Sequence, residues 1–249
     1  MTPPSPTERG AAGASAQARA DELRREERRF QHRRAARWML PALLAWWITA
    51  QFSAIFFPGL SAYLFATAVP YFLLRRFYTT SPEVARWQRG ARGEQRTARI
   101  LRPLTRRAGW VVLHDRALPG TRANLDHLAL VPDGRGAVYI DTKTTRGGGV
   151  VALRGDVLHI GKTAYRDAVK TVRFEAAQAS KVLGVPVHPV IAVHGATVPH
   201  GRIRHTDLLV VSARSLRAAL ASIPHNRDPD AVRALATKAA TDLPPYTQR

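Results

Sequence analysis

The sequence predicts an α/β protein in which a mixed β-sheet flanked by helices follows a two-helix transmembrane hairpin. After residue 80, apolar runs of strand length alternate with segments of helical periodicity, which is typical of helices packed against a sheet. Before that point, the 37 residues of 38–74 contain no charged side chain, which indicates a membrane segment. The chain therefore divides into an anchor and an ordinary domain.

The composition favours a polyanionic partner. There are 38 basic and 18 acidic residues, and the formal net charge is +20, which suits nucleic acid or anionic lipid headgroups. Only five of the basic residues are lysines, so a coding preference for arginine is an alternative source of this charge. Cysteine is absent, which excludes a disulfide framework and a thiolate metal site.

The N-terminal third predicts a membrane anchor. Residues 1–19 are rich in Pro, Ser, Ala and Gly and predict disorder, and residues 20–37 predict a charged juxtamembrane helix. The hairpin is expected at 38–76, with its turn at Pro58-Gly59. Arginines flank both ends of the uncharged run, so the positive-inside rule places both termini and the domain on the cytoplasmic side of the cell membrane. The alternative is a buried helical hairpin in a soluble protein.

The domain itself begins with a helix at Ser81, where a serine cap is followed by Pro82 and Glu83. This helix is expected to reach about residue 104. Strands are then expected at 110–115, 124–131, 136–143, 150–154, 157–160, 187–194 and 207–212. Further helices are expected at 164–183, 214–222 and 229–240.

Two acidic residues and a lysine stand on consecutive predicted strands. Asp126 lies in "NLDHLALV", and Asp141 and Lys143 lie in "GAVYIDTK". Alternate residues of a strand share a face, so Asp141 and Lys143 point the same way. Carboxylates and an ammonium group held on a buried sheet suit a hard divalent cation and a polarised water.

Glu94 supplies a third carboxylate on the first helix of the domain. It falls on an otherwise apolar stripe at spacings of three and four, formed by Val84, Trp87, Ala91, Ala98 and Leu101. A carboxylate on a face that packs against a sheet is costly unless it is paired, hydrogen-bonded or bound to metal. An arginine partner at the rim of the core is the simpler explanation of Glu94 alone. Together with Asp126, Asp141 and Lys143, it predicts a shared site.

Other chemistries find little support. His127 alternates to the face opposite Asp126, so a packed or hydrogen-bonded histidine is expected there rather than a metal ligand. The remaining histidines lack a zinc-ligand spacing, and the chain has neither a Walker loop nor a Gly-x-Ser-x-Gly elbow. Zinc enzymes, stand-alone ATPases and serine hydrolases are therefore disfavoured.

The run of Gly93-Glu94, "GWVVLHDRALP", "NLDHLALV", "GAVYIDTK" and the following glycine-rich turn resembles the NERD (nuclease-related) domain. That domain is grouped with the PD-(D/E)XK nuclease superfamily, so the resemblance implies a restriction-endonuclease-like fold. It implies that Asp126 and Asp141 bind Mg²⁺ or Mn²⁺, that Lys143 guides the attacking water, and that Glu94 supports the metal. Gln178 matches a glutamine often found on the following helix. The nuclease-like domain is expected at 81–195, with 196–249 as its C-terminal strand-helix extension.

The function implied is hydrolysis of phosphodiester bonds in DNA, with RNA as the less favoured substrate. Four arginines near the predicted strands are candidates for contacts with the nucleic-acid backbone: Arg116, Arg122, Arg135 and Arg146. They have a simpler explanation as residues that solubilise turns. Two other functions stay open, namely a non-catalytic scaffold that binds nucleic acid or protein and an enzyme acting on a small phosphodiester.

Overall fold

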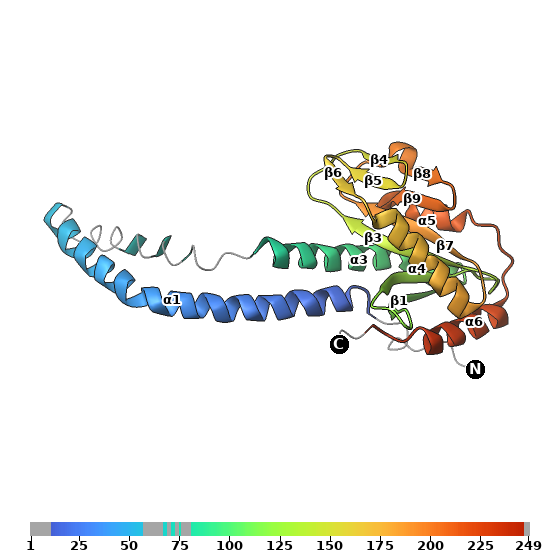
Figure 1. Ribbon diagram of the computed structural model, residues 1–249, viewed down its shortest axis with the longest axis horizontal. Coiled ribbons are helices and arrows are strands. Elements are labelled where there is room, and N and C mark those ends of the chain that lie inside the picture. Colours follow the sequence, from blue (N-terminus) through green and yellow to red (C-terminus); the bar gives the residue numbers. More distant parts are fainter. Residues whose placement is uncertain (1–10, 57–66, 69–70, 73–74, 76–80, 247–249) are drawn as a thin grey trace. The chain divides into compact units, whose positions relative to one another are not determined.

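The computed structural model describes residues 11–56, 67–68, 71–72, 75 and 81–246, and Figure 1 labels most of its helices and strands. The chain divides into two compact units, one formed by Met1–Gln17 with Gln88–Arg249 and the other by Ala18–Trp87. The first unit contains both β-sheets and all the residues for which chemistry was predicted. The candidate site therefore belongs to that unit alone.

Helix α1 (Ala14–Phe56) is continuous through three regions that the sequence analysis separated. It begins within the segment 1–19 that was predicted to be disordered, and it continues through the charged segment 20–37 into the uncharged run. The prediction of disorder is wrong from Ala14 onward, because contacts remote in sequence order this segment. Ser15 is buried, and its backbone N–H donates a hydrogen bond to the carboxylate of Asp115.

No helix among the described residues is both long enough and apolar enough to span a membrane. The transmembrane hairpin predicted for 38–76 is therefore wrong, and the cell-membrane location inferred from it is wrong as well. Absence of charge is a weaker criterion than hydropathy, and Pro41, Thr49 and Gln51 interrupt the apolar residues of α1. Most of the second predicted span lies outside the described residues.

A six-stranded mixed sheet forms the centre of the first unit, with the strand order β1-β2-β3-β7-β9-β8. The three strands β1, β2 and β3 are antiparallel, whereas β3, β7 and β9 run parallel to one another. The strands are β1 (Val111–Ala117), β2 (Asn124–Leu130), β3 (Ala137–Thr144), β7 (Val187–His194), β8 (Arg202–His205) and β9 (Leu208–Ser212). A second, three-stranded sheet contains β4 (Val151–Arg154), β5 (Val157–Ile160) and β6 (Thr163–Tyr165).

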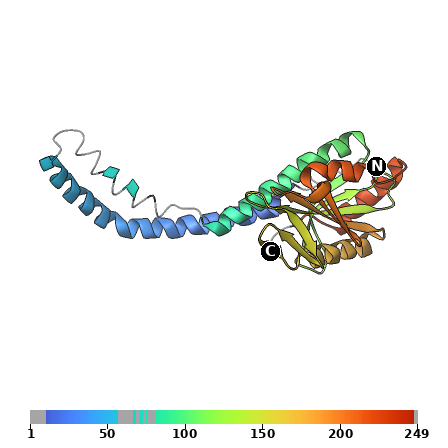
Figure 2. The same ribbon diagram turned by 90° about the horizontal axis from the view of Figure 1, so that it is seen from above.

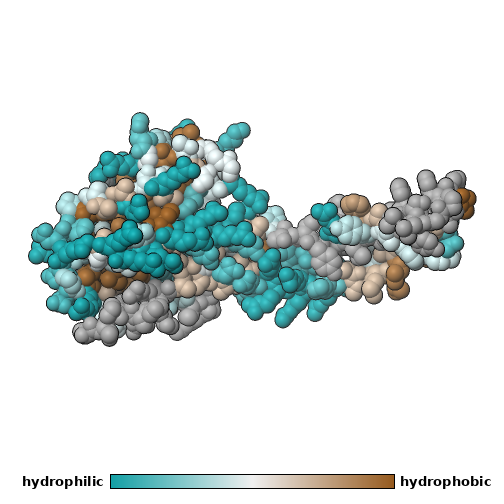
Figure 3. Space-filling model, turned by 180° about the vertical axis from the view of Figure 1, so that it is seen from behind, coloured by the Kyte–Doolittle hydropathy of each residue, from teal (hydrophilic) through white to brown (hydrophobic). Residues whose placement is uncertain are grey.

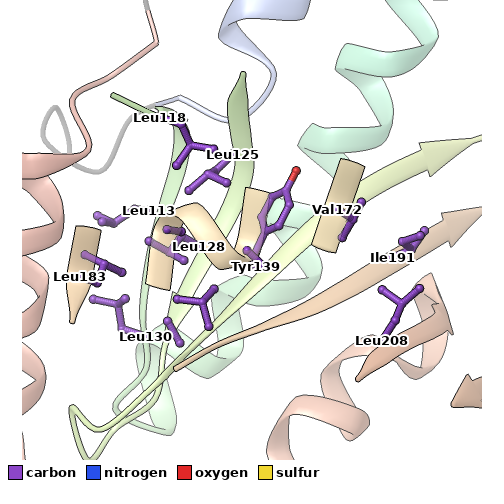
Figure 4. Packing of buried hydrophobic residues seen from close by; sticks show 14 of the residues in the cluster. Leu113, Leu118, Leu125, Leu128, Leu130, Tyr139, Val172, Leu183, Ile191 and Leu208 are labelled. Atoms are coloured by element: carbon purple, nitrogen blue, oxygen red, sulfur yellow. The ribbon is translucent and has the colours of Figure 1, made fainter. Parts of the chain in front are cut away.

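Helices cover both faces of the central sheet, and α3 and α4 lie on opposite sides of it (Figure 2). One core cluster joins the sheet to α4 and α6, and Figure 4 shows its leucines gathered around Tyr139. The other cluster joins the opposite face to α3 and α5. The helices are α3 (Pro82–Arg107), α4 (Ala168–Leu183), α5 (Ala213–Ala221) and α6 (Pro229–Asp242), and a 3-10 turn, η1, spans Pro199–Gly201.

Most elements agree with the sequence prediction. The predicted cap at Ser81 is present, since its side chain accepts a hydrogen bond from Val84 N–H. Ser212 and Asp228 cap α5 and α6 in the same way, accepting from Ser215 N–H and Ala231 N–H. The prediction missed β6 and β8. Residues of β6 were assigned to the start of the following helix, and β8 is a polar edge strand without an apolar alternation.

Candidate active site

The predicted acidic residues lie where strands β2 and β3 stop pairing. Their antiparallel register runs from Leu130↔Ala137 to His127↔Ile140, and the next positions are Asp126 and Asp141. There the backbone N–H of Thr142 donates a hydrogen bond of 2.9 Å to Asp126 Oδ2 instead of to a backbone carbonyl. The Asp126 side chain thus accepts a hydrogen bond from a backbone N–H of β3 at the point where β2 diverges, and this bond connects Asp126 to β3.

Asp141 and Lys143 share a face of β3, as the strand alternation predicted, and form an ion pair. Lys143 Nζ lies 2.7 Å from Asp141 Oδ1, and the aspartate is buried. Burial alone would lower the pKa of Lys143, but the neighbouring carboxylates of Asp141, Asp126 and Glu175 outweigh it and raise that pKa. The amine is therefore protonated at neutral pH and acts as a hydrogen-bond donor.

Helix α3 brings Glu94 to the same end of the sheet because Gly93 permits a close approach to β3. A Cβ atom at position 93 would overlap Thr144 Oγ1 and would lie 3.3 Å from Thr142 Cγ2. Glu94 is buried, and no described group hydrogen-bonds its Oε2. Burial raises the pKa of Glu94 to about 7, and the charges of Asp115 and Asp141 add to this shift.

The three predicted carboxylates are electrostatically coupled. Burial raises the pKa of Asp126 well above its ordinary value, and Glu94 and Asp141 raise it further. The ammonium group of Lys143 and the Thr142 N–H partly offset this effect. Glu94, Asp126, Asp141 and Lys143 therefore form one cluster, in which carboxylates outnumber cations.

Glu175 on α4 is a fourth carboxylate of this cluster, and sequence reasoning missed it. It accepts a hydrogen bond of 2.7 Å from the hydroxyl of Tyr139 and is buried. Burial raises the pKa of Glu175 to about 7, with a further increase from Asp141 and a decrease from Lys143. Its signal was available, because Glu175 interrupts an apolar stripe at helical spacing, as Glu94 does. Gln178, predicted from the family resemblance, lies three residues later and is partly buried.

Asp115 on β1 was also missed, and no local pattern marks it. Its backbone has a φ of +52°, which a non-glycine residue seldom adopts, and its side chain is buried. It accepts hydrogen bonds from Ser15 N–H at 2.6 Å and from Asn124 Nδ2 at 3.0 Å. Asp115 therefore links the N-terminal segment to the cluster and raises the pKa of Glu94.

His127 lies on the other face of β2, as expected, and pairs with a second histidine. The Nδ1 atoms of His114 and His127 are 2.8 Å apart, so one ring donates and the other accepts. Burial lowers the pKa of His114 to about 4 and that of His127 well below its ordinary value. Both rings are therefore neutral at pH 7, which agrees with a packed, hydrogen-bonded histidine.

The four arginines proposed as nucleic-acid contacts are in different environments. Arg116 is fully buried and donates a hydrogen bond to the carbonyl of Ala240, which argues against the contact expected for it. Arg135 is exposed, but it stands in the β2–β3 turn, at the opposite end of these strands from the cluster. Arg122 precedes β2 and Arg146 follows β3, so both exposed side chains are at the end of the strands that carries the cluster. The face seen in Figure 3 is mostly hydrophilic.

The donor set suits a hard divalent cation by its chemistry, because every ligand is a carboxylate oxygen. Two of these oxygens, Glu94 Oε2 and Asp141 Oδ2, are buried without a hydrogen-bond partner among the described residues. Over the same residues, however, no three Asp, Glu, His or Cys side chains are arranged so that they could hold a metal ion. In the described arrangement the ammonium group of Lys143 contacts Asp141 Oδ1 at 2.7 Å.

Comparison with protein families finds a match between residues 89–198 and the nuclease-related (NERD) domain. The matched range includes Glu94, Asp126, Asp141, Lys143 and Glu175, and it ends before β8. Comparisons with curated proteins and with solved structures found no match. The nuclease-related domain predicted from the sequence is therefore confirmed, and the mixed six-stranded sheet with its helices is consistent with it.

Proposed function

We propose that this protein is a metal-dependent nuclease that hydrolyses phosphodiester bonds, in DNA rather than RNA. The proposal is carried by the buried cluster of carboxylates around one protonated lysine, at the point where β2 and β3 diverge. Its support is the location of this cluster inside the matched nuclease-related domain. A buried excess of carboxylates is costly for a protein whose site binds no cation.

Asp126, Asp141 and Glu94 are the residues that would hold Mg²⁺ or Mn²⁺, and their side chains would have to converge to do so, since no three such side chains meet in the described arrangement. When bound, the ion supplies charge neutralisation at the scissile phosphate and makes a water molecule more acidic. Lys143 is protonated, so it orients the water or a phosphate oxygen by donating hydrogen bonds and does not act as the base. Glu175, which accepts a hydrogen bond from the Tyr139 hydroxyl, adds a further carboxylate to the cluster from α4. Hydrolysis adds the hydroxyl of the water to phosphorus and its proton to the leaving oxygen.

A second function, a non-catalytic scaffold that binds nucleic acid or protein, is favoured by one observation. Lys143 Nζ already contacts Asp141 Oδ1 at 2.7 Å, and no three donors among the described residues converge on a metal position. Such a protein would retain the nuclease-related fold without the reaction. The choice between the two functions therefore depends on whether a divalent cation produces cleavage.

The test is a cleavage assay of the full chain on supercoiled, linear and branched DNA and on RNA, with Mg²⁺, Mn²⁺ or EDTA. We expect metal-dependent cleavage of DNA that Asp141→Asn and Lys143→Met each reduce at least 100-fold, since removal of one transition-state contact has effects of roughly this size. Matched controls are Asp230→Asn and Lys181→Met, which alter exposed residues on α6 and α4. A wild-type protein that binds DNA but is as inactive as both variants would establish the scaffold instead.

A further inference from the structure

Helix α3 and strand β1 border a groove of about 800 Å³ whose chemistry differs from that of the carboxylate cluster. Three arginines of α3 line it, Arg99, Arg102 and Arg106, and no acidic side chain is among the described residues that do so. Its apolar lining includes Leu101 and Val112. The groove therefore combines positive charge with a preformed surface.

The three arginines are available for a ligand. All three side chains are exposed, and none forms an ion pair within the described part of the chain. Their spacing of three and then four residues places them on one face of α3. From Arg99 to Arg106 the helix rises by about 10 Å, a distance that covers the roughly 7 Å over which three successive phosphates of one strand advance along the duplex axis.

The groove leads toward the candidate active site along the same helix. Gln95 lines the groove, and it directly follows Glu94 of the carboxylate cluster. The strand residues of that cluster, Asp141 and Lys143, are on the α4 side of the sheet, because they alternate with Ile140, which packs on the α3 side. The arginines are therefore separate from the reacting groups, but continuous with them along α3.

We propose that this groove binds the phosphate backbone of a nucleic acid, three phosphates to Arg99, Arg102 and Arg106, beside the stretch that enters the carboxylate cluster. Guanidinium groups bind phosphate oxygens in a bidentate manner, and such contacts carry no sequence preference. A nucleic acid is favoured over a free phosphate because three cations in a row match a repeating charge better than a single one. This inference rests on the proposed function for the identity of the partner, but not on catalysis.

The test measures binding of a labelled duplex to the full chain in EDTA, as a function of salt concentration. In the triple variant Arg99→Gln/Arg102→Gln/Arg106→Gln, we expect the slope of log K against log[salt] to decrease in magnitude by about 2.7, which is 0.9 for each phosphate contact. Between 50 and 200 mM salt, the wild type should then lose roughly 40-fold more affinity than the variant. The loss should be equal for duplexes of unrelated sequence.

The matched control is Arg154→Gln/Arg202→Gln/Arg204→Gln, which removes three exposed arginines from β4 and the far edge strand β8. It should leave the salt slope within about 1 of the wild-type value. Arg→Lys at the three groove positions should retain most of the slope, which separates loss of charge from loss of folding. An unchanged slope in the groove variant would overturn the proposal, even if the Lys143→Met assay supports cleavage. If the groove binds DNA but the protein cleaves none, the groove proposal is supported and the proposed nuclease activity is overturned instead.

Discussion

At the scale of single residues, the cluster is defined by carboxyl groups whose charged form is disfavoured by burial more than it is stabilised by neighbouring hydrogen-bond donors and cations. The pKa of Glu94 and of Glu175 is raised to about 7, in each case chiefly by desolvation. Each of these groups is therefore close to half-protonated at neutral pH, while Lys143 stays charged. A divalent cation competes with these protons, so we expect metal affinity at the cluster to rise with pH.

Glu175→Gln tests the state of a buried carboxyl group directly. A raised pKa means that the folded protein holds its proton more tightly than the unfolded chain does. The contribution of Glu175 to stability is thus present below about pH 4.5 and is lost as the pH rises to about 7. Glutamine resembles the protonated acid at every pH. We therefore expect the free energy of unfolding of the variant to rise relative to that of the wild type over this range, by up to about 3 kcal/mol above pH 7.

The measurement is urea unfolding of both proteins in EDTA at several pH values from 4.5 to 8. Glu83→Gln, an exposed glutamate of α3, is the control and should show no comparable trend. If the difference in unfolding free energy between wild type and Glu175→Gln does not vary with pH, burial does not raise the pKa of Glu175.

At the scale of elements, the contact of α3 with β3 depends on one glycine. Gly93→Ala would place a Cβ atom on Thr144 Oγ1 and 3.1 Å from Thr144 Cβ, and rotation of the threonine side chain relieves only the first of these contacts. We expect a loss of about 1–3 kcal/mol in the free energy of unfolding, together with reduced cleavage, because α3 also positions Glu94.

Gly90→Ala is a matched control on the same helix. Nothing lies within 4 Å of a Cβ atom at position 90, so the substitution should stabilise α3 by about 0.5–1 kcal/mol through helix propensity alone. Chemical unfolding of both variants is the measurement. Equal effects of the two substitutions would mean that α3 does not pack closely on β3 at Gly93.

Sequence patterns were sufficient for the elements whose burial repeats locally. The bounds of β5 and β7 are those expected, β4 begins one residue later than expected, and Glu94 was found because it breaks an apolar stripe. Glu175 breaks such a stripe on α4 in the same way, so the sequence contains a local signal for it. Asp115 could not be found, since its role arises from a positive φ and from contacts with residues 100 positions earlier. The uncharged run of α1 led to a wrong prediction of a membrane span, because absence of charge does not by itself give sufficient hydropathy.

At the scale of the whole molecule, the N-terminal segment is part of the first unit rather than an appendage. The backbone N–H of Gly13 donates a hydrogen bond to Glu94, and that of Ser15 donates one to Asp115. Two donors at the start of α1 thus satisfy two carboxylates of the domain, an arrangement that the helix dipole also favours. The segment therefore stabilises the negative charge of the cluster while it is itself ordered by that charge.

Gly13→Ala should detach this segment from the domain. Gly13 has a φ of +73°, and a Cβ atom there would lie 2.8 Å from the backbone oxygen of Ala91. Strain and overlap together should cost about 2–4 kcal/mol. Gly120→Ala separates the two causes, because Gly120 has the same φ but nothing lies within 4 Å of a Cβ atom there. Strain alone should therefore lower the free energy of unfolding of this variant by about 1–2 kcal/mol.

Chemical unfolding measures both losses of stability, and limited proteolysis should cleave near residue 13 faster in Gly13→Ala alone. If both variants are equally stable and equally resistant, the N-terminal segment does not pack on the domain.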